Sequence, residues 1–255
     1  LLAPWEGRFG TFEGDAFRAR AMEAYVGVPG MNALARHLAA DLDVRVGRRV
    51  TRLARGAAGW TPALEEGPEL GPFDRVVLAV PAAQAAPLLG DHPFAARAAE
   101  VRVDASLTAM VAYPAALGLP FDAARDAAGG LAWMARETSK PGRPGLGDGG
   151  LEAWTLQAGP ALSAAELELD KAAIAERLHG LFAERVATLG LSVPEPALAM
   201  GHRWRFAQTR APLGEACLWD GAEGLGVCGD WCLGDRLEHA FRSGRAMAGR
   251  LLGAG

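Results

Sequence analysis

The residues best placed to do chemistry follow a short apolar run near the C-terminus, 225–228. Gly229 and Asp230 come directly after this run, and a helix is expected to open near Leu237 and Glu238. A glycine at a strand end lets the backbone approach a ligand closely, and an aspartate accepts hydrogen bonds from a polyol or a ribose. The positive end of a helix holds an electron-rich or anionic group. The segment predicts a ligand site, although an ordinary strand and helix joined by a tight glycine turn fits the same residues.

The cysteines of the chain, Cys217, Cys228 and Cys232, also lie in this segment. Their odd number and close spacing argue against a disulfide framework and for a reducing compartment, so we expect a cytoplasmic protein. Even with His239 nearby, the C-x3-C spacing lacks a second pair of ligands. We therefore expect no metal site.

Cations and aromatic rings mix over 202–206, and Trp133, Trp154 and Trp231 add large planar side chains. Such rings can line an apolar pocket for a planar substrate, but a half-buried strand and ordinary core tryptophans explain them as well. Lys140 lies in the Gly- and Pro-rich segment 139–150, where we expect a mobile loop and a solvated lysine. The sequence names no catalytic acid or base.

The composition is that of a globular chain, because 50% of the 255 residues are apolar and 22% are charged. No run reaches the roughly 18 uninterrupted apolar residues of a membrane span. A net charge of −4 provides no field that would favour nucleic acid or an anionic bilayer. We therefore expect a protein that binds neither membrane nor nucleic acid. The first residue is not methionine and no signal peptide is recognisable, so we expect the chain to be a fragment. The oligomeric state stays open.

Strand-like and helical patterns interleave, which predicts a mixed α/β fold. The continuous apolar run 73–81 predicts a strand buried on both faces, with an Ala-rich helix over 82–89 behind it. Further strands are expected over 44–46, 50–53, 60–64, 104–113, 131–136, 151–157, 199–206 and 225–228. One helix is expected over 30–41, and a second begins at a capping box at 163–166 and ends at Gly190. A third is expected over 237–252, and its inward-facing residues would be Leu237, Phe241, Gly244, Met247, Ala248 and Leu251.

Five segments occur in an informative order: 25–31 (YVGVPGM), 50–53 (VTRL), 73–81 (FDRVVLAVP), 228–230 (CGD) and 238–244 (EHAFRSG). In this order they resemble the flavin amine oxidase superfamily, and within it the renalase-like branch of NAD/FAD-dependent oxidoreductases. The resemblance implies an α/β fold in which a partial glutathione-reductase-type FAD-binding domain is interleaved with an antiparallel-sheet substrate domain. It assigns 1–24 and 91–199 to the substrate domain, and 25–90 and 200–255 to the FAD-binding domain.

The resemblance also implies which residues would meet FAD. Val50 would contact the adenine through its backbone, while Ala79 and Pro81 would lie near the adenosine ribose and the pyrophosphate. Gly229 and Asp230 would meet the ribityl chain and the pyrophosphate. Trp231 lies beside this turn and is implied as well. The closing helix would meet the pyrimidine edge of the flavin through Arg236, Leu237, Glu238 and Ala240.

The sequence departs from the family pattern at two places. The usual N-terminal G-x-G-x-x-G segment has no counterpart before Tyr25, and the match at 224–229 overlaps a strand and leaves too little chain for a nucleotide-binding unit. The lysine that amine oxidases usually place on the first substrate-domain strand is also missing, because Thr108 and Ala109 are the nearest candidates. Amine oxidation is therefore not expected.

The expected function is an FAD-dependent oxidoreductase, present as an N-terminally truncated chain. A small organic donor would give a hydride to the flavin, and oxygen would reoxidise it. The alternative is a non-catalytic binding or structural module that no longer holds flavin.

Overall fold

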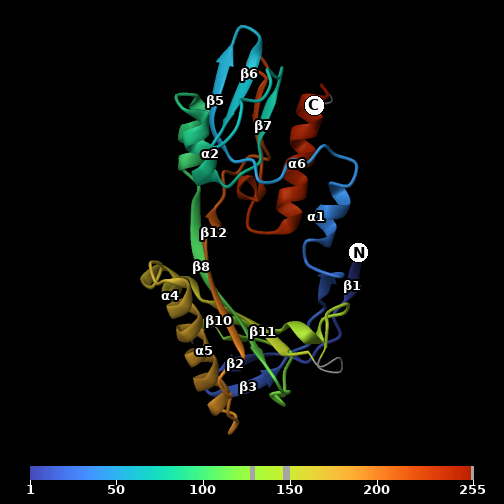
Figure 1. The fold of residues 1–255 in the computed structure, drawn as a ribbon, viewed down its shortest axis with the longest axis vertical. Helices are drawn as coiled ribbons and strands as arrows, with labels where there is room; N and C mark the ends of the chain where they lie inside the picture. Colours follow the sequence, from blue (N-terminus) through green and yellow to red (C-terminus); the bar gives the residue numbers. More distant parts are fainter. Residues whose placement is uncertain (127–129, 146–149, 254–255) are drawn as a thin grey trace. The chain divides into compact units, whose positions relative to one another are not determined.

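A computed structural model of the chain describes residues 1–126, 130–145 and 150–253 (Figure 1). The fold is mixed α/β, as the sequence predicts. It divides into two compact units, each built from two stretches of chain: 1–43 with 105–205, and 44–104 with 206–255. These boundaries lie later than the expected ones, so that 25–43 belongs to the first unit. The assignment of the units to substrate and to FAD stays a prediction.

The first unit is built on a seven-stranded sheet in the order β12-β8-β11-β10-β9-β2-β3. The strands are β2 (Phe9–Glu13), β3 (Ala16–Ala19), β8 (Arg102–Tyr113), β9 (Ala123–Asp126), β10 (Leu131–Arg136), β11 (Glu152–Ala158) and β12 (Leu198–Ala211). Four pairs are antiparallel: β8–β11, β11–β10, β10–β9 and β2–β3. The pair β2–β9 is parallel. A two-stranded sheet of β1 (Leu2–Pro4) and β4 (Tyr25–Gly27), the short α1 (Ala33–Leu38) and the 3-10 turn η1 (Glu137–Ser139) complete the strand-rich part.

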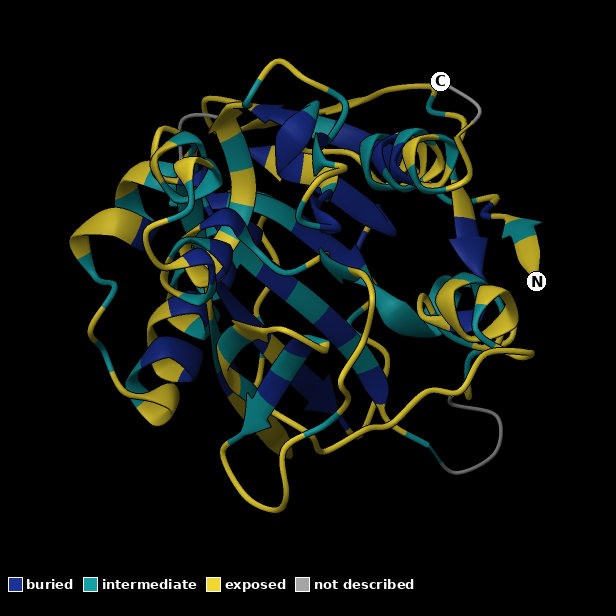
Figure 2. Ribbon diagram, turned by 90° about the horizontal axis from the view of Figure 1, so that it is seen from above, coloured by how far each residue is buried: buried dark blue, intermediate teal, exposed yellow. Residues whose placement is uncertain are grey.

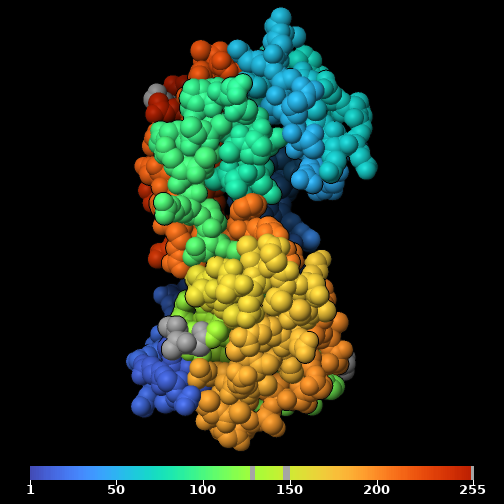
Figure 3. Space-filling view, turned by 90° about the vertical axis from the view of Figure 1, so that its left-hand side faces the viewer, coloured from blue at the N-terminus to red at the C-terminus, as the bar shows by residue number. Residues whose placement is uncertain are grey.

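Two helices, α4 (Pro160–Ala165) and α5 (Lys171–Ala187), cover one face of this sheet and form the continuous yellow surface in Figure 3. α5 buries Ile174, Leu178, Phe182 and Val186, which recur every four residues and therefore share one helix face. They pack on odd-numbered residues of β8 and on Trp154 and Leu156 of β11. Burial alternates residue by residue along β11, as expected for a strand covered on one face. Bands of buried and partly buried residues on the strands can be seen in Figure 2.

The expected capping box at 163–166 is wrong. Pro160 occupies the first turn of α4, so this helix begins four residues earlier than the box requires. Ser163 lies inside α4, fully buried, and its hydroxyl accepts the N–H of Leu107 (3.1 Å). The cap of α5 is Asp170, whose carboxylate accepts the N–H of Ala173 (2.9 Å).

The second unit contains the parallel pair β7 (Val76–Leu78) and β14 (Leu225–Val227), with β13 (Leu218–Asp220) antiparallel on the other side of β14. Around this sheet lie the hairpin β5 (Val50–Gly56) and β6 (Gly59–Leu64), the helices α2 (Ala82–Leu89), α3 (Pro93–Ala99) and α6 (Leu237–Leu251), and the 3-10 turn η3 (Asp230–Cys232). The core includes Trp60, Leu78, Ala85, Leu225, Val227 and Trp231.

Several expected elements of this unit need correction. Residues 44–46 form no strand, because the chain turns at Gly47 with φ +68° and leaves Val44 and Val46 exposed. Within the run 73–81 only Val76–Leu78 is a strand, and of its residues only Leu78 is buried, because β7 lies at one edge of the sheet. The helix over 82–89 is confirmed.

The inward face of α6 also differs from the expectation. Leu237 and Phe241 are 69% and 51% exposed, whereas Ser243 and Met247 are buried. Met247 packs against Gly226 of β14 so closely that a Cβ there would lie 2.7 Å from its sulfur. Only the middle of α6 packs against the sheet, which leaves its first turn exposed. Among the described residues, no helix has the length and apolar character needed to cross a membrane.

Candidate functional site

A cavity of about 390 Å³ lies in the second unit, where the parallel strands β7 and β14 end. Ligands bind at the carboxyl ends of parallel strands because loops and helix starts leave space there. Most of the lining side chains are small: Ala79, Val80, Pro81 and Ala82 after β7, Val103 of β8, Phe206, Ala207 and Thr209 of β12, Cys228, Gly229, Asp230 and Trp231 after β14, and Ala240 and Gly244 of α6.

Gly229 forms the turn between β14 and η3, and the local packing requires a glycine. A Cβ at this position would lie 2.6 Å from Nε1 of Trp231. That indole is buried and donates a hydrogen bond to the carbonyl of Val80 (3.0 Å), so it cannot move aside freely. The missing side chain therefore lets the Trp231 indole pack directly against the backbone of the turn.

Asp230 is the one carboxylate among the residues that line the cavity. Its Oδ1 accepts the N–H of Trp231 (2.8 Å), which holds the carboxylate at the start of η3. The side chain is exposed. A carboxylate has about four acceptor positions, so Asp230 retains capacity for ligand hydroxyl groups.

A larger groove, of about 1030 Å³, adjoins the cavity on the other side of Ala79 and Val80, which line both hollows. Val50 at the start of β5 lines this groove, and Arg48 and Arg49 add positive charge. The two hollows together follow the end of β7. Their arrangement suits an elongated ligand, with the positive charge of the arginines at the groove, where Arg49 also pairs with Glu65 at 3.4 Å.

The residues predicted from sequence fall into three groups. Six line the cavity: Ala79, Pro81, Gly229, Asp230, Trp231 and Ala240. Val50 lines the adjoining groove. Arg236, Leu237 and Glu238 line neither hollow and are exposed, although the N–H groups of Leu237 and Glu238 have no acceptor within α6 because they open the helix.

Of the eight lining residues that sequence reasoning did not name as site residues, four come from distant strands: Val103, Phe206, Ala207 and Thr209. They lie on β8 and β12, far in sequence from the glycine turn. Only tertiary structure brings these strands to the cavity. Phe206 was visible as part of the aromatic segment 202–206, but its position in that segment carried no indication of a cavity.

The segment 202–206 separates into two faces of β12. Arg203 and Arg205 pair with Glu168 at 3.3 and 2.9 Å. On alternate positions, His202 and Trp204 meet edge to face with ring centroids 4.3 Å apart, and Trp204 is exposed. Cations and aromatic rings, adjacent in sequence, therefore do not act together here.

The expected solvated lysine is wrong: the Lys140 side chain is only 10% exposed. Its Nζ lies 2.5 Å from Oε1 of Glu137 and 5.1 Å from the ring centroid of Trp5. The ammonium is thus held by an ion pair and a cation–π contact. Part of the expected mobile loop, 146–149, lies outside the described residues.

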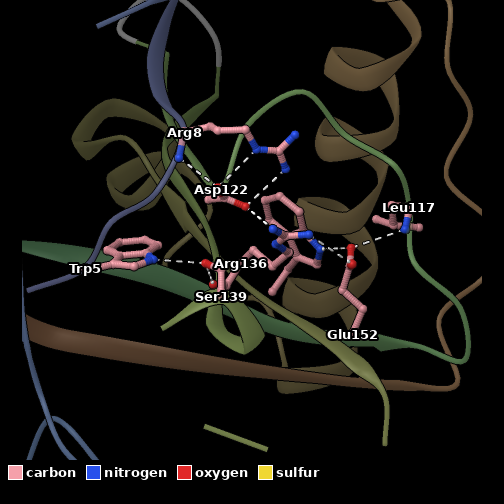
Figure 4. Close-up of polar contacts among 8 residues, drawn as sticks. Trp5, Arg8, Leu117, Asp122, Arg136, Ser139 and Glu152 are labelled. Carbon is pink, nitrogen blue, oxygen red and sulfur yellow. Dashed lines mark hydrogen bonds and ion pairs between the residues drawn. The ribbon is translucent and has the colours of Figure 1, made fainter. Parts of the chain in front are cut away.

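An ionic network in the first unit joins two buried carboxylates, Asp122 and Glu152, to the partly exposed guanidinium groups of Arg8 and Arg136 (Figure 4). Asp122 accepts hydrogen bonds from the backbone and guanidinium of Arg8 and from Arg136. Glu152 pairs with Arg136 at 3.5 Å and accepts the indole N–H of Trp154 (2.8 Å). Burial acts to raise the pKa of Asp122, but hydrogen bonds from Arg8 and the charge of Arg136 outweigh it and hold the pKa below the usual value.

The cysteines form no recognised metal site: within the described ranges, no cluster of three or more His, Cys, Asp or Glu side chains could hold an ion. Cys228 and Cys232 are buried, and burial raises the pKa of both thiols, that of Cys232 to about 12. Thr108, at the position where a family lysine was sought, is buried and its hydroxyl has no hydrogen-bond partner. Trp154 is a core residue of the first unit rather than a pocket wall.

The residues of the two hollows fit a flavin dinucleotide. A bare glycine backbone and small side chains leave room at the strand ends, where even a Cβ on Gly244 would meet no atom within 4 Å. Asp230 offers acceptors for hydroxyl groups, and Arg48 and Arg49 offer positive charge in the adjoining groove. A carboxylate acceptor and nearby arginines match the hydroxyl and phosphate groups of such a ligand better than they match a metal ion or an acyl group.

Three solved structures share this fold at low sequence identity. A putative protoporphyrinogen oxidase from Exiguobacterium sp. 255-15 aligns with TM-score 0.66 at 15% identity, covering 89% of this chain and 52% of its own. A putrescine oxidase variant aligns with TM-score 0.58 at 14% identity, covering 91% and 54%. Cyclohexylamine oxidase from Brevibacterium oxydans IH-35A aligns with TM-score 0.56 at 15% identity, covering 79% and 47%. The chain thus spans about half the length of these proteins.

The sequence itself matches the profile of the flavin containing amine oxidoreductases over residues 7–252. This match includes both stretches of each unit and the whole of the cavity lining. The chain therefore belongs to the flavin containing amine oxidoreductase family.

Proposed function

We propose that this chain binds FAD in the cavity and the adjoining groove, and that it serves a flavin-dependent oxidoreductase acting on a small organic donor. The observation that carries the proposal is the glycine turn Gly229-Asp230 at the ends of two parallel strands, in a chain of this family. When bound, FAD would supply the hydride acceptor, and oxygen would regenerate it.

The chain's own residues would bind and orient the cofactor. The backbone at Gly229 would approach the ribityl and pyrophosphate part, and Asp230 would accept hydrogen bonds from hydroxyl groups. Val50 and Ala79 line the groove proposed for the adenosine. The first turn of α6, at Leu237 and Glu238, would direct its positive end toward the electron-rich edge of the flavin.

Three finer points are part of the proposal. The family match supports an amine-oxidoreductase relative, but placement in the renalase-like branch rests only on the order of the sequence segments. The absence of the family lysine, with Thr108 in that region, supports a donor other than a simple amine. A cytoplasmic location also stays a prediction.

The test is a titration of the purified chain, and of an N-terminally extended chain, with FAD, followed by visible absorption and fluorescence. We expect the absorption bands of protein-bound oxidised flavin. Colour only in the extended chain would mean that a further segment completes the site. A failure of both chains to bind FAD would overturn the proposal and favour a non-catalytic binding or structural module.

Asp230→Asn sharpens the titration. The amide oxygen still accepts the N–H of Trp231, but the charge-assisted hydrogen bonds to a polyol are lost, which costs about 1.5 kcal/mol or roughly tenfold in FAD affinity. Asp235→Asn is the matched control, because Asp235 is exposed and lines neither hollow. Equal affinities for the two variants would contradict the role of Asp230.

A further inference from the structure

The strands β13 and β14 place two cysteines opposite each other. Their register pairs Leu218 with Val227, so that the next opposed positions are Cys217 and Cys228. Directly opposed residues of an antiparallel pair point to the same face of the sheet. The two thiols therefore share the face on which α6 packs, where Met247 contacts Gly226.

The hydrogen-bond pattern defines the type of pair. The N–H of Cys228 donates to Leu78 of β7 (2.9 Å), away from β13, so Cys217 and Cys228 form a non-hydrogen-bonded pair. Such pairs bring Cα atoms to about 4.5 Å, within the range of about 4.4 to 6.8 Å found for disulfides. The geometry thus requires no backbone rearrangement to join the two sulfurs.

A serine fixes this geometry from α6. The next ladder bond, between Gly229 and Ala216, is replaced by the hydroxyl of Ser243, which accepts the N–H of Gly229 (2.9 Å) and donates to the carbonyl of Ala216 (2.6 Å). Ser243 is fully buried. The ladder opens only after the cysteine pair, so the two strands are held on both sides of it.

We propose that Cys217 and Cys228 are a thiol pair that a hydroperoxide converts into a cross-strand disulfide beside the cavity. One thiolate attacks the peroxide O–O bond, giving a sulfenic acid and, after protonation, water or an alcohol. The second thiol attacks the sulfenic sulfur, the S–S bond forms, and water leaves. The two sulfurs lose two electrons in total, and the peroxide oxygens gain them.

The third cysteine is not part of the pair. Cys232 is fully buried, and its thiol is hydrogen-bonded to Ser243 and carries a pKa of about 12, raised by burial. Burial also raises the pKa of Cys217, with Arg250 lowering it and Glu215 raising it. The pKa of Cys228 is raised by burial and by Cys217. Because little thiolate is present at neutral pH, oxidation is slow and accelerates as the pH rises.

The test starts from the fully reduced chain, treated with hydrogen peroxide and then alkylated with N-ethylmaleimide. We expect the intact mass to fall by two hydrogen atoms before alkylation, and the number of alkylated thiols to fall from the three present to one. Cleavage after Glu223 separates Cys217 from Cys228, and cleavage after Trp231 separates Cys228 from Cys232. The peptides of Cys217 and Cys228 should stay joined without reductant.

Variants identify the partners, and far-UV circular dichroism checks their fold. Cys232→Ser should retain the disulfide in full, whereas Cys217→Ser and Cys228→Ser should each abolish it. Three free thiols after peroxide, a link that includes Cys232, or oxygen addition without a disulfide would overturn the proposal. The mapping on the unsubstituted chain decides the question even if a variant fails to fold.

Discussion

The two units treat polar groups in opposite ways. In the first unit, Asp122, Arg136 and Glu152 lie close together and form ion pairs, and only Nε of Arg136 in this group is buried without a hydrogen-bond partner. In the second unit, the cavity lining contains one carboxylate, Asp230, among mostly small side chains. The dense group of titratable residues in the first unit therefore has a structural role, whereas the cavity of the second unit, with few titratable residues, has room for a ligand.

The largest expected effect breaks the ionic network. Asp122→Asn removes the buried carboxylate that Arg8 and Arg136 share; because Arg8 is 54% exposed and Arg136 keeps Glu152, we expect a loss of about 1 to 3 kcal/mol. Urea unfolding measures the loss. Glu13→Gln, in an exposed pair with Arg20, should cost less than about 1 kcal/mol. A similar small loss for both variants would show that the network carries no stability.

Acid should act on the same network. The pKa of Asp122 is lower in the folded chain than in the unfolded one, so its stabilisation is complete above about pH 4 and is lost as the pH falls through the folded pKa. The free energy of unfolding of the Asp122→Asn variant should therefore fall less steeply below pH 4. Parallel pH profiles of the variant and the unsubstituted chain would refute this assignment.

Filling the cavity should affect FAD binding and leave stability nearly unchanged. Gly244→Leu places a side chain in open space on the cavity wall, and we expect FAD affinity to fall at least tenfold, or about 1.4 kcal/mol. Gly249→Leu is the matched control on α6, since its Cβ also meets open space but lines neither hollow. Equal FAD affinities of the two variants would show that FAD does not bind in the cavity.

The smallest effect concerns Lys140. Lys140→Met removes the ion pair with Glu137 and the cation–π contact with Trp5 but keeps an apolar side chain, so we expect a loss of about 1 kcal/mol in unfolding free energy. FAD affinity should not change. If Lys140→Met weakened FAD affinity and left the unfolding free energy unchanged, Lys140 would contribute to cofactor binding and not to the stability of the first unit.

Local sequence patterns predicted several secondary-structure elements of the second unit well, because each of these elements is formed by neighbouring residues; the ligand site itself stays a prediction. The turn at Gly229 and Asp230, the helix 82–89 and the start of α6 follow from apolar runs, glycine and helical spacing. What the patterns missed depends on tertiary packing. Phe206 lines the cavity although no local pattern indicates it, and Lys140 is largely shielded from solvent beside Trp5 and Glu137. Ser163 matches a capping motif, yet Pro160 starts the helix first.

The segmented course of the chain has a consequence for its synthesis. β2, at residues 9–13, pairs with β9 at 123–126, and the sheet of the first unit ends in β12 at 198–211. Neither unit is complete until the chain has passed residue 205. The N-terminal strands must therefore wait, unpaired with β9, while more than a hundred residues emerge from the ribosome. Folding should be slow, because contacts between distant parts of the chain must form first, and chaperone supply then becomes a determinant of yield.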